Sequence, residues 1–207
     1  MALVKHNNNS ISAVTSMPNI STGSMTLIKE QTASSSASIS FVDGSSDVVL
    51  DSTYPIYKFE FINIHPATDL AFFTFNLSVD TGSNYNVTKT STHFHAGHNE
   101  AGDTTYFQYD ASRDLAQSTA FENININTGN GNDECVSGSM TLFNPSSTTF
   151  VKHYISKSAT YNGYDYMFNH HVAGYGNTTS AVDAVQFKMS SGNIDAGTIK
   201  LYGIKDS

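Results

Sequence analysis

The stretch LAFFTFNLSVD, residues 70–80, alternates between apolar and polar side chains along most of its length. The apolar residues of one parity are Phe73, Phe75, Leu77 and Val79. Successive side chains of a β-strand point to opposite faces of its sheet, whereas a helix repeats every 3.6 residues. The alternation therefore predicts a strand with one face turned toward an apolar core.

Similar short stretches recur along the chain, separated by turn-forming sequences such as GNGND, NPSST and SSGNIDAG. The other predicted strands are residues 25–32, 36–43, 56–64, 85–96, 121–128, 135–144, 149–156, 168–175, 184–190 and 197–204. Only residues 110–118 suggest a helical turn. Many short strands without alternating helices predict an antiparallel β-sandwich of jelly-roll type over residues 25–207. No internal repeat supports a propeller or a solenoid.

Residues 1–24 differ from the rest of the chain. The stretch is polar, with scattered aliphatic residues and no sustained period. It cannot bury enough apolar surface to fold alone. We therefore expect a tethering arm that lies on its own domain, on a sister subunit or on a different protein.

Charge and composition exclude several classes of partner. The chain has 10 basic and 18 acidic residues, a formal charge of −8, and no cluster of Lys or Arg. Nucleic acids and anionic membranes are bound through basic surfaces, so neither is an expected partner. No apolar leader and no apolar run of membrane-spanning length is present, which predicts a soluble protein made in a cytoplasm. The single cysteine allows no intrachain disulfide.

The sequence THFHAGHNE places three histidines close together at His93, His95 and His98. In a strand, His93 and His95 share one face, and we expect Phe94 to face the core and the histidines to face outward. Imidazole nitrogens bind transition metals, so three readings remain: surface histidines without metal, a site within one chain, or a site between subunits on a symmetry axis. The sequence NHH, residues 169–171, offers two adjacent histidines, and in a strand at most one of His170 and His171 can join a given site.

A second candidate site is the tyrosine-rich stretch SATYNGYDYMFN, residues 158–169. Tyr161, Tyr164 and Tyr166 stand among small polar residues, a composition typical of recognition surfaces. Aromatic faces with amide neighbours suit a glycan, although a strand edge or a subunit contact would have the same composition. Residues 129–134, GNGNDE, cluster oxygen ligands for calcium without the EF-hand spacing, and turn chemistry explains them equally well.

Several stretches resemble a family of small virion structural proteins of marine tailed bacteriophages and cyanophages. These are MALVKHNNNSISAVTS, LFNPSSTTFVKHYIS, AGYGNTTSAVDAVQF and KMSSGNIDAGTIKLYGIKDS, within which SSGNIDAGTIKLYGI is the most specific. The resemblance covers nearly the whole chain. It implies a location in the virion. It does not say whether the protein belongs to the head or to the tail, and it supplies no catalytic residues.

The leading prediction is a non-enzymatic virion structural protein without a cofactor, either a head-decoration or a fibre-like subunit anchored by residues 1–24. Its partners would be other virion proteins and further copies of itself, with a trimer as the expected oligomer. The alternative is a tail-fibre module that recognises host surface glycans. A glycan-degrading enzyme, the third hypothesis, needs a carboxylate pair in a cleft, and no hydrolase motif is present.

Overall fold

The computed structural model describes residues 25–205, and these residues form two antiparallel β-sheets packed face to face. No helix occurs among them, and none therefore could span a membrane. The predicted antiparallel β-sandwich is confirmed. Its jelly-roll connectivity stays a prediction, and the predicted arm, residues 1–24, lies outside the described residues.

The large sheet has eight strands and the small sheet has four. In spatial order, the large sheet consists of β1 (Met25–Thr32), β12 (Ile194–Ile204), β3 (Ile56–Pro66), β8 (Val136–Phe143), β9 (Lys152–Tyr161), β10 (Tyr166–Gly176), β5 (Lys89–Asn99) and β6 (Thr105–Tyr109). The small sheet consists of β2 (Ile39–Val42), β11 (Ala184–Met189), β4 (Phe73–Ser78) and β7 (Glu122–Asn123).

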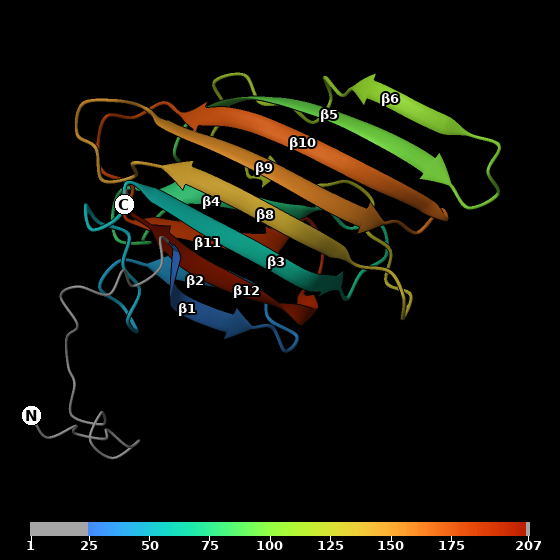
Figure 1. Cartoon of the computed structure of the whole chain (residues 1–207), viewed down its shortest axis with the longest axis horizontal. Coiled ribbons are helices and arrows are strands. Elements are labelled where there is room, and N and C mark those ends of the chain that lie inside the picture. The colour runs from blue at the N-terminus through green and yellow to red at the C-terminus, as the bar shows by residue number, and fades with distance from the viewer. Residues whose placement is uncertain (1–24, 206–207) are drawn as a thin grey trace, which may run out of the picture.

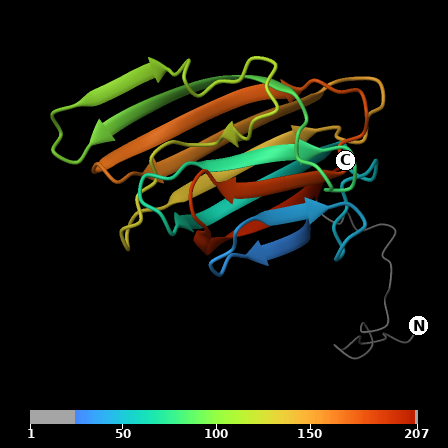
Figure 2. The same cartoon turned by 180° about the vertical axis from the view of Figure 1, so that it is seen from behind.

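The two sheets differ in width, and this difference places the functional sites. The small sheet lies behind β12, β3 and β8, whereas β10, β5 and β6 extend beyond it (Figure 1). Seen from behind, the segment between β6 and β8 runs across the back of this extension (Figure 2). The inner face of the large sheet therefore has two halves with different coverings.

The first half is an aromatic core built around Phe187 of β11. Its ring centroid lies 5.2 Å from that of Phe59 and 5.3 Å from that of Phe61, both on β3 of the opposite sheet. Within the small sheet it stacks on Phe73 of β4 at 5.7 Å. Phe187 and these neighbours are fully buried or nearly so. Edge-to-face aromatic pairs of this kind add to the free energy gained by burying their area.

The second half, which we call the polar half, is the inner face of β9, β10 and β5. Its buried side chains are mostly polar: Ser156, Ser158, Thr160, His170, Lys89, Ser91, His93 and His95. Irregular chain from the β6–β8 segment covers it through hydrogen bonds. The backbone N–H of Ser91 donates to the carbonyl of Leu115 at 2.9 Å, and the Ser158 hydroxyl donates to the carbonyl of Ile124 at 3.0 Å. The irregular chain has backbone N–H and carbonyl groups free to bond to polar side chains beneath it. The backbone groups of a second sheet would already be bonded to one another.

A buried polar network marks the boundary between the two halves. The Tyr154 hydroxyl of β9 donates to the Glu122 carboxylate of β7 at 2.8 Å, and the Lys89 ammonium donates to the side-chain oxygen of Asn76. Burial raises the pKa of Glu122 and lowers that of Lys89 to about 8. These groups tie β4 and β7 of the small sheet to β5 and β9 of the large one.

Most predicted strands are present, and the differences have physical causes. Strand β6 was not predicted, because its residues are all exposed and show no buried face. The predicted strand 121–128 contains only the two-residue β7, since its side chains bond across to β9 and β4 instead of continuing a ladder. The segment 110–118 forms turns, not a helix. Strand β12 lies between β1 and β3, with Ile199 and Leu201 buried.

We expect Phe187→Ala to lower the free energy of unfolding by about 3–5 kcal/mol, because it empties the centre of the aromatic core. Urea unfolding followed by circular dichroism would measure the change. Phe150→Ala is the matched control, since Phe150 is 70% exposed and should change stability by less than about 0.5 kcal/mol. Equal effects of the two substitutions would contradict the assignment of Phe187 to the core.

Candidate functional site

The structure reverses the predicted orientation of the THFHAGHNE strand. His93 and His95 do share a face, but this face is the inner one: His93 is fully buried and His95 is 5% exposed. Phe94 points outward, is 37% exposed, and stacks on His171 of β10 at 4.9 Å. The prediction placed the apolar residue inside, and it was wrong because the chain that covers this part of the sheet is polar.

His170 joins these two histidines from the neighbouring strand. The register of β10 on β5 pairs His170 with His95 and Val172 with His93, so all three rings lie on the inner face. One nitrogen of each ring lies within 4.8 Å of the others. His93 Nε2 and His170 Nδ1 are 3.2 Å apart. We call His93, His95 and His170 the histidine cluster.

The histidine cluster holds more buried polar atoms than its contacts satisfy. The pair His93 Nε2 and His170 Nδ1 can form one hydrogen bond. His93 Nδ1, His95 Nδ1 and His170 Nε2 are buried and have no hydrogen-bond partner among the described residues. A buried polar group left without a partner costs about 1–3 kcal/mol. Three such nitrogens in one cluster need partners that the described residues do not supply.

The surroundings keep the three imidazoles neutral. Burial lowers the pKa of His93 to about 4, although the nearby Asp110 carboxylate opposes the shift. Burial also lowers the pKa of His95, again against Asp110, and lowers that of His170, where His93 and His95 act in the same direction. Asp110 follows β6, and its backbone N–H donates to the His93 carbonyl at 2.8 Å. Neutral imidazole is the form that binds a metal ion.

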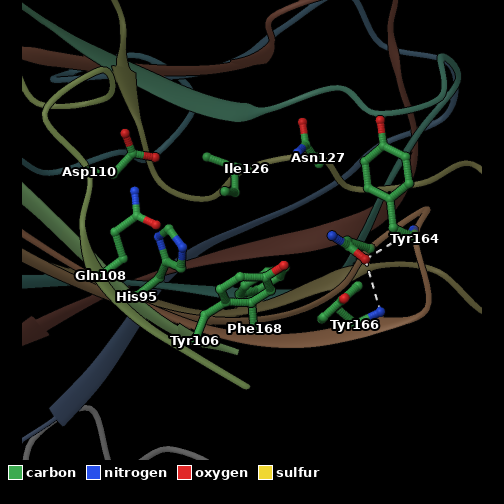
Figure 3. Close-up of a pocket in the computed structure, with 10 residues that line it drawn as sticks. His95, Tyr106, Gln108, Asp110, Ile126, Asn127, Tyr164, Tyr166 and Phe168 are labelled. Carbon is green, nitrogen blue, oxygen red and sulfur yellow. Dashed lines mark hydrogen bonds between the residues drawn. The ribbon is translucent and has the colours of Figure 1, made fainter. Parts of the chain in front are cut away.

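A pocket of about 380 Å³ opens beside the histidine cluster and shares His95 with it. Aromatic, amide and carboxylate side chains line it: His95, Tyr106, Gln108, Asp110, Ile126, Asn127, Asn162, Tyr164, Tyr166 and Phe168. We call it the tyrosine pocket. His95, Gln108 and Asp110 lie toward one end of it and Tyr164 toward the other (Figure 3).

Stacked rings give the tyrosine pocket a flat aromatic surface. Phe168 of β10 stacks on Tyr166 at 5.6 Å and on Tyr106 of β6 at 6.2 Å. The glycine at position 97 permits this arrangement, because a Cβ there would lie 2.2 Å from the Phe168 ring. The glycine of the THFHAGHNE stretch thus makes room for the ring on which the pocket is built.

Asn162 fixes the loop that carries the pocket tyrosines. Its side-chain oxygen accepts hydrogen bonds from the backbone N–H groups of Tyr164 and Tyr166, both at 3.0 Å (Figure 3). The backbone N–H of Gly163 donates to the carbonyl of Asn127 on the opposite wall at 3.3 Å. Because the loop is held on both sides, the pocket is shaped before any ligand binds.

The predicted site residues divide between these sites and the rest of the surface. Tyr164 and Tyr166 line the tyrosine pocket, whereas Tyr161 does not, and its hydroxyl donates to Asp165 at 3.2 Å. His98 is exposed on β5 and stands apart from the histidine cluster. A metal site between subunits requires His93 and His95 on the outward face of β5. That face carries Phe94 instead, and the two histidines are buried.

Sequence reasoning assigned no role to His170, Tyr106 and Asp110. One signal could have found His170, since it shares strand parity with Phe168 and Val172, which are apolar and buried. Tyr106 belongs to the strand that was not predicted, and Asp110 follows it. In the calcium candidate, residues 129–134, the Glu134 carboxylate accepts a hydrogen bond from the backbone N–H of Gly131, as in a turn.

Comparisons with protein-family models, with curated proteins and with solved structures find no match to this chain.

We expect acid to destabilise the chain in the presence of a chelator. In the unfolded chain, a histidine has a pKa of about 6.5 and takes up a proton below that pH. In the folded chain, burial lowers the pKa of His93 to about 4. Stability therefore falls as the pH drops from about 6.5 toward 4, by about 2 kcal/mol for His93 alone at about pH 5.

Urea midpoints at neutral and acidic pH would measure this loss. His95→Gln should reduce the dependence on pH, and His98→Gln, on the same strand but exposed, should leave it unchanged. A midpoint that does not change with pH in this range would show that the buried histidines take up protons as freely as those of the unfolded chain.

Proposed function

We propose that the chain is a non-enzymatic structural subunit of a phage virion, a head-decoration or fibre-like protein that works as an assembly of several copies. The observation that carries the assembly of several copies is the strand at the edge of the large sheet. Among residues 25–205, β6 pairs with β5 alone, and all five of its residues are exposed. An open strand edge is a liability for a free monomer and a docking element for a subunit.

Exposed apolar side chains continue from this edge over the neighbouring strands. Phe107 is 82% exposed and Tyr109 is 51% exposed, and both lie on the face opposite the tyrosine pocket. Phe94 of β5 lies beside Phe107 at 6.1 Å, and Met167 of β10 is also exposed. We call Phe94, Phe107, Tyr109 and Met167 the outer apolar surface. Grouped apolar residues of this kind mark contact surfaces between proteins.

The virion assignment itself is supported by the resemblance of the sequence to small phage structural proteins. The composition agrees with it, because an acidic surface rich in Ser, Thr and Asn resists nonspecific association in a densely packed particle. Further copies of the chain and other virion proteins are the partners that we propose, with a trimer as the expected oligomer. Residues 1–24 are proposed as the tether.

We expect the purified chain to form an oligomer that Phe107→Lys converts to monomers, because a charge placed in the outer apolar surface cannot be buried without a partner. Light scattering coupled to size exclusion would measure the mass. Phe150→Lys is the matched control, since Phe150 is an exposed phenylalanine away from β6 and should leave the mass unchanged. A wild-type monomer would contradict assembly through this surface in solution.

The location needs a separate experiment. Virions purified on a density gradient from an infected culture should contain the chain in a fixed ratio to the major capsid protein, as measured by mass spectrometry. Recovery of the chain only in the soluble lysate would overturn the virion assignment, whatever its oligomeric state.

The tyrosine pocket favours a second candidate function, recognition of host surface glycans. Flat aromatic surfaces pack against the apolar faces of sugar rings, while amides and carboxylates bond to their hydroxyl groups. Tyr106, Tyr166 and Phe168 provide the first kind of contact, and Gln108, Asn127 and Asp110 provide groups for the second. The pocket is large enough for a small ligand and is held open by Asn162.

A glycan array would test this candidate. We expect binding of a defined set of glycans, and a loss of about tenfold or more with Tyr164→Ser, in line with about 1–3 kcal/mol for one aromatic contact in a site. Tyr164 is exposed, so its substitution should not affect folding. Phe150→Ser serves as the control outside the pocket. If the wild-type chain binds no glycan, the glycan-recognition candidate is excluded and the structural role is the only one of the two that remains.

A further inference from the structure

We propose that the histidine cluster is a binding site for a divalent transition metal of the zinc class, formed by His93, His95 and His170 of a single chain. The site is independent of the outer apolar surface and goes beyond the structural role. It differs from the site expected from the sequence, because the third ligand comes from β10 instead of from His98.

The spacing of the nitrogens fits such an ion. Zinc lies about 2.0–2.1 Å from each imidazole nitrogen, so two nitrogens of a tetrahedral site are roughly 3.3 Å apart. His93 Nε2 and His170 Nδ1 are 3.2 Å apart, and a nitrogen of His95 completes a group within 4.8 Å. The His93 and His170 nitrogens already have this spacing, and the proposal requires the His95 ring to turn so that its nitrogen comes equally close.

The sheet holds these ligands in place. His95 and His170 are direct partners in the register of β5 on β10. His93 lies two residues before His95 in β5, on the same face of the sheet. The rings also pack against one another, at centroid distances of 5.4 Å for His93 with His170 and 5.6 Å for His95 with His170. Ligands on two paired strands lose little conformational freedom when the ion binds.

The unsatisfied nitrogens are the second observation. Among residues 25–205, His95 Nδ1 is buried without a partner, and the unpaired nitrogens of His93 and His170 are the ring atoms opposite the close pair Nε2 and Nδ1. A buried cluster of imidazoles without a ligand has no evident structural use, since alkyl side chains would fill the same space without unpaired polar atoms. An ion bound between His93 Nε2 and His170 Nδ1 takes a lone pair from each, and the unpaired His95 Nδ1 can supply a third.

The pocket side supplies the remaining coordination. His95 and Asp110 both line the tyrosine pocket, and at one end of it they lie near each other (Figure 3). Water from the pocket can therefore provide a fourth ligand, and the Asp110 carboxylate, which lies outside the group of three ligand atoms, offsets part of the charge of the ion. Three nitrogens with one open position favour zinc or cobalt over calcium and magnesium, which prefer oxygen ligands.

Calorimetric titration of the full chain, freed of metal by a chelator and dialysed, tests the proposal with zinc chloride as the probe. We expect one ion per chain and a loss of affinity of about 100-fold or more with His95→Gln or His170→Gln, beyond the 10–100-fold typical of outer-shell changes. Cobalt should give the intense visible absorption of a tetrahedral site. Circular dichroism of each variant checks that it is folded.

Two matched controls make the result specific. His171→Gln changes the residue next to His170 on the opposite face, and His98→Gln changes the exposed histidine of β5. Both should bind zinc as the wild type does. The proposal is overturned if the folded wild-type chain binds no zinc, if His98→Gln abolishes binding while His95→Gln and His170→Gln do not, or if one ion is shared among three chains.

Discussion

The packing of a narrow sheet against one half of a wide sheet is the constraint on which the rest of the structure depends. Phe187 lies at the centre of that contact and touches aromatic side chains of both layers. Four strands can cover only part of eight. The remaining strands, β9, β10 and β5, must bury their inner faces against something else, and the chain between β6 and β8 does this.

Irregular chain covers this half of the large sheet in place of a second sheet. This explains why the histidine cluster and the tyrosine pocket lie at the same end of the molecule. A loop presents backbone N–H and carbonyl groups, so strand residues beneath it such as Ser91 and Ser158 are polar and bond to it instead of being aliphatic. The same loop brings Asp110 to the histidine cluster and Ile126 and Asn127 to the wall of the tyrosine pocket. On the opposite face, the same extension carries the outer apolar surface, so that the proposed binding sites and the proposed assembly surface lie on two sides of it.

The sequence predicted the core well and the site only in part, and the reason is physical. Alternation identifies strands whose inner face is apolar, as in β4 and β12, where Phe75 and Leu201 are fully buried. The same rule failed on β5, because it assigns the apolar Phe94 to the interior when the covering layer is polar. It also gave no sign of β6, whose residues are exposed on both faces. The position of His170 opposite His95 depends on the register of two strands more than seventy residues apart in sequence, which no local pattern contains.

The most direct test of this description is a crystal structure of the chain grown with zinc, with anomalous diffraction measured on both sides of the zinc absorption edge. A single anomalous peak bonded to nitrogens of His93, His95 and His170, bordering the tyrosine pocket, is the predicted result. It would establish that the polar half of the wide sheet is a ligand-binding centre. The contradicting result is a histidine cluster bridged by water with no peak, or a peak on a symmetry axis at His98, which would make this end of the sheet a structural surface without a metal site.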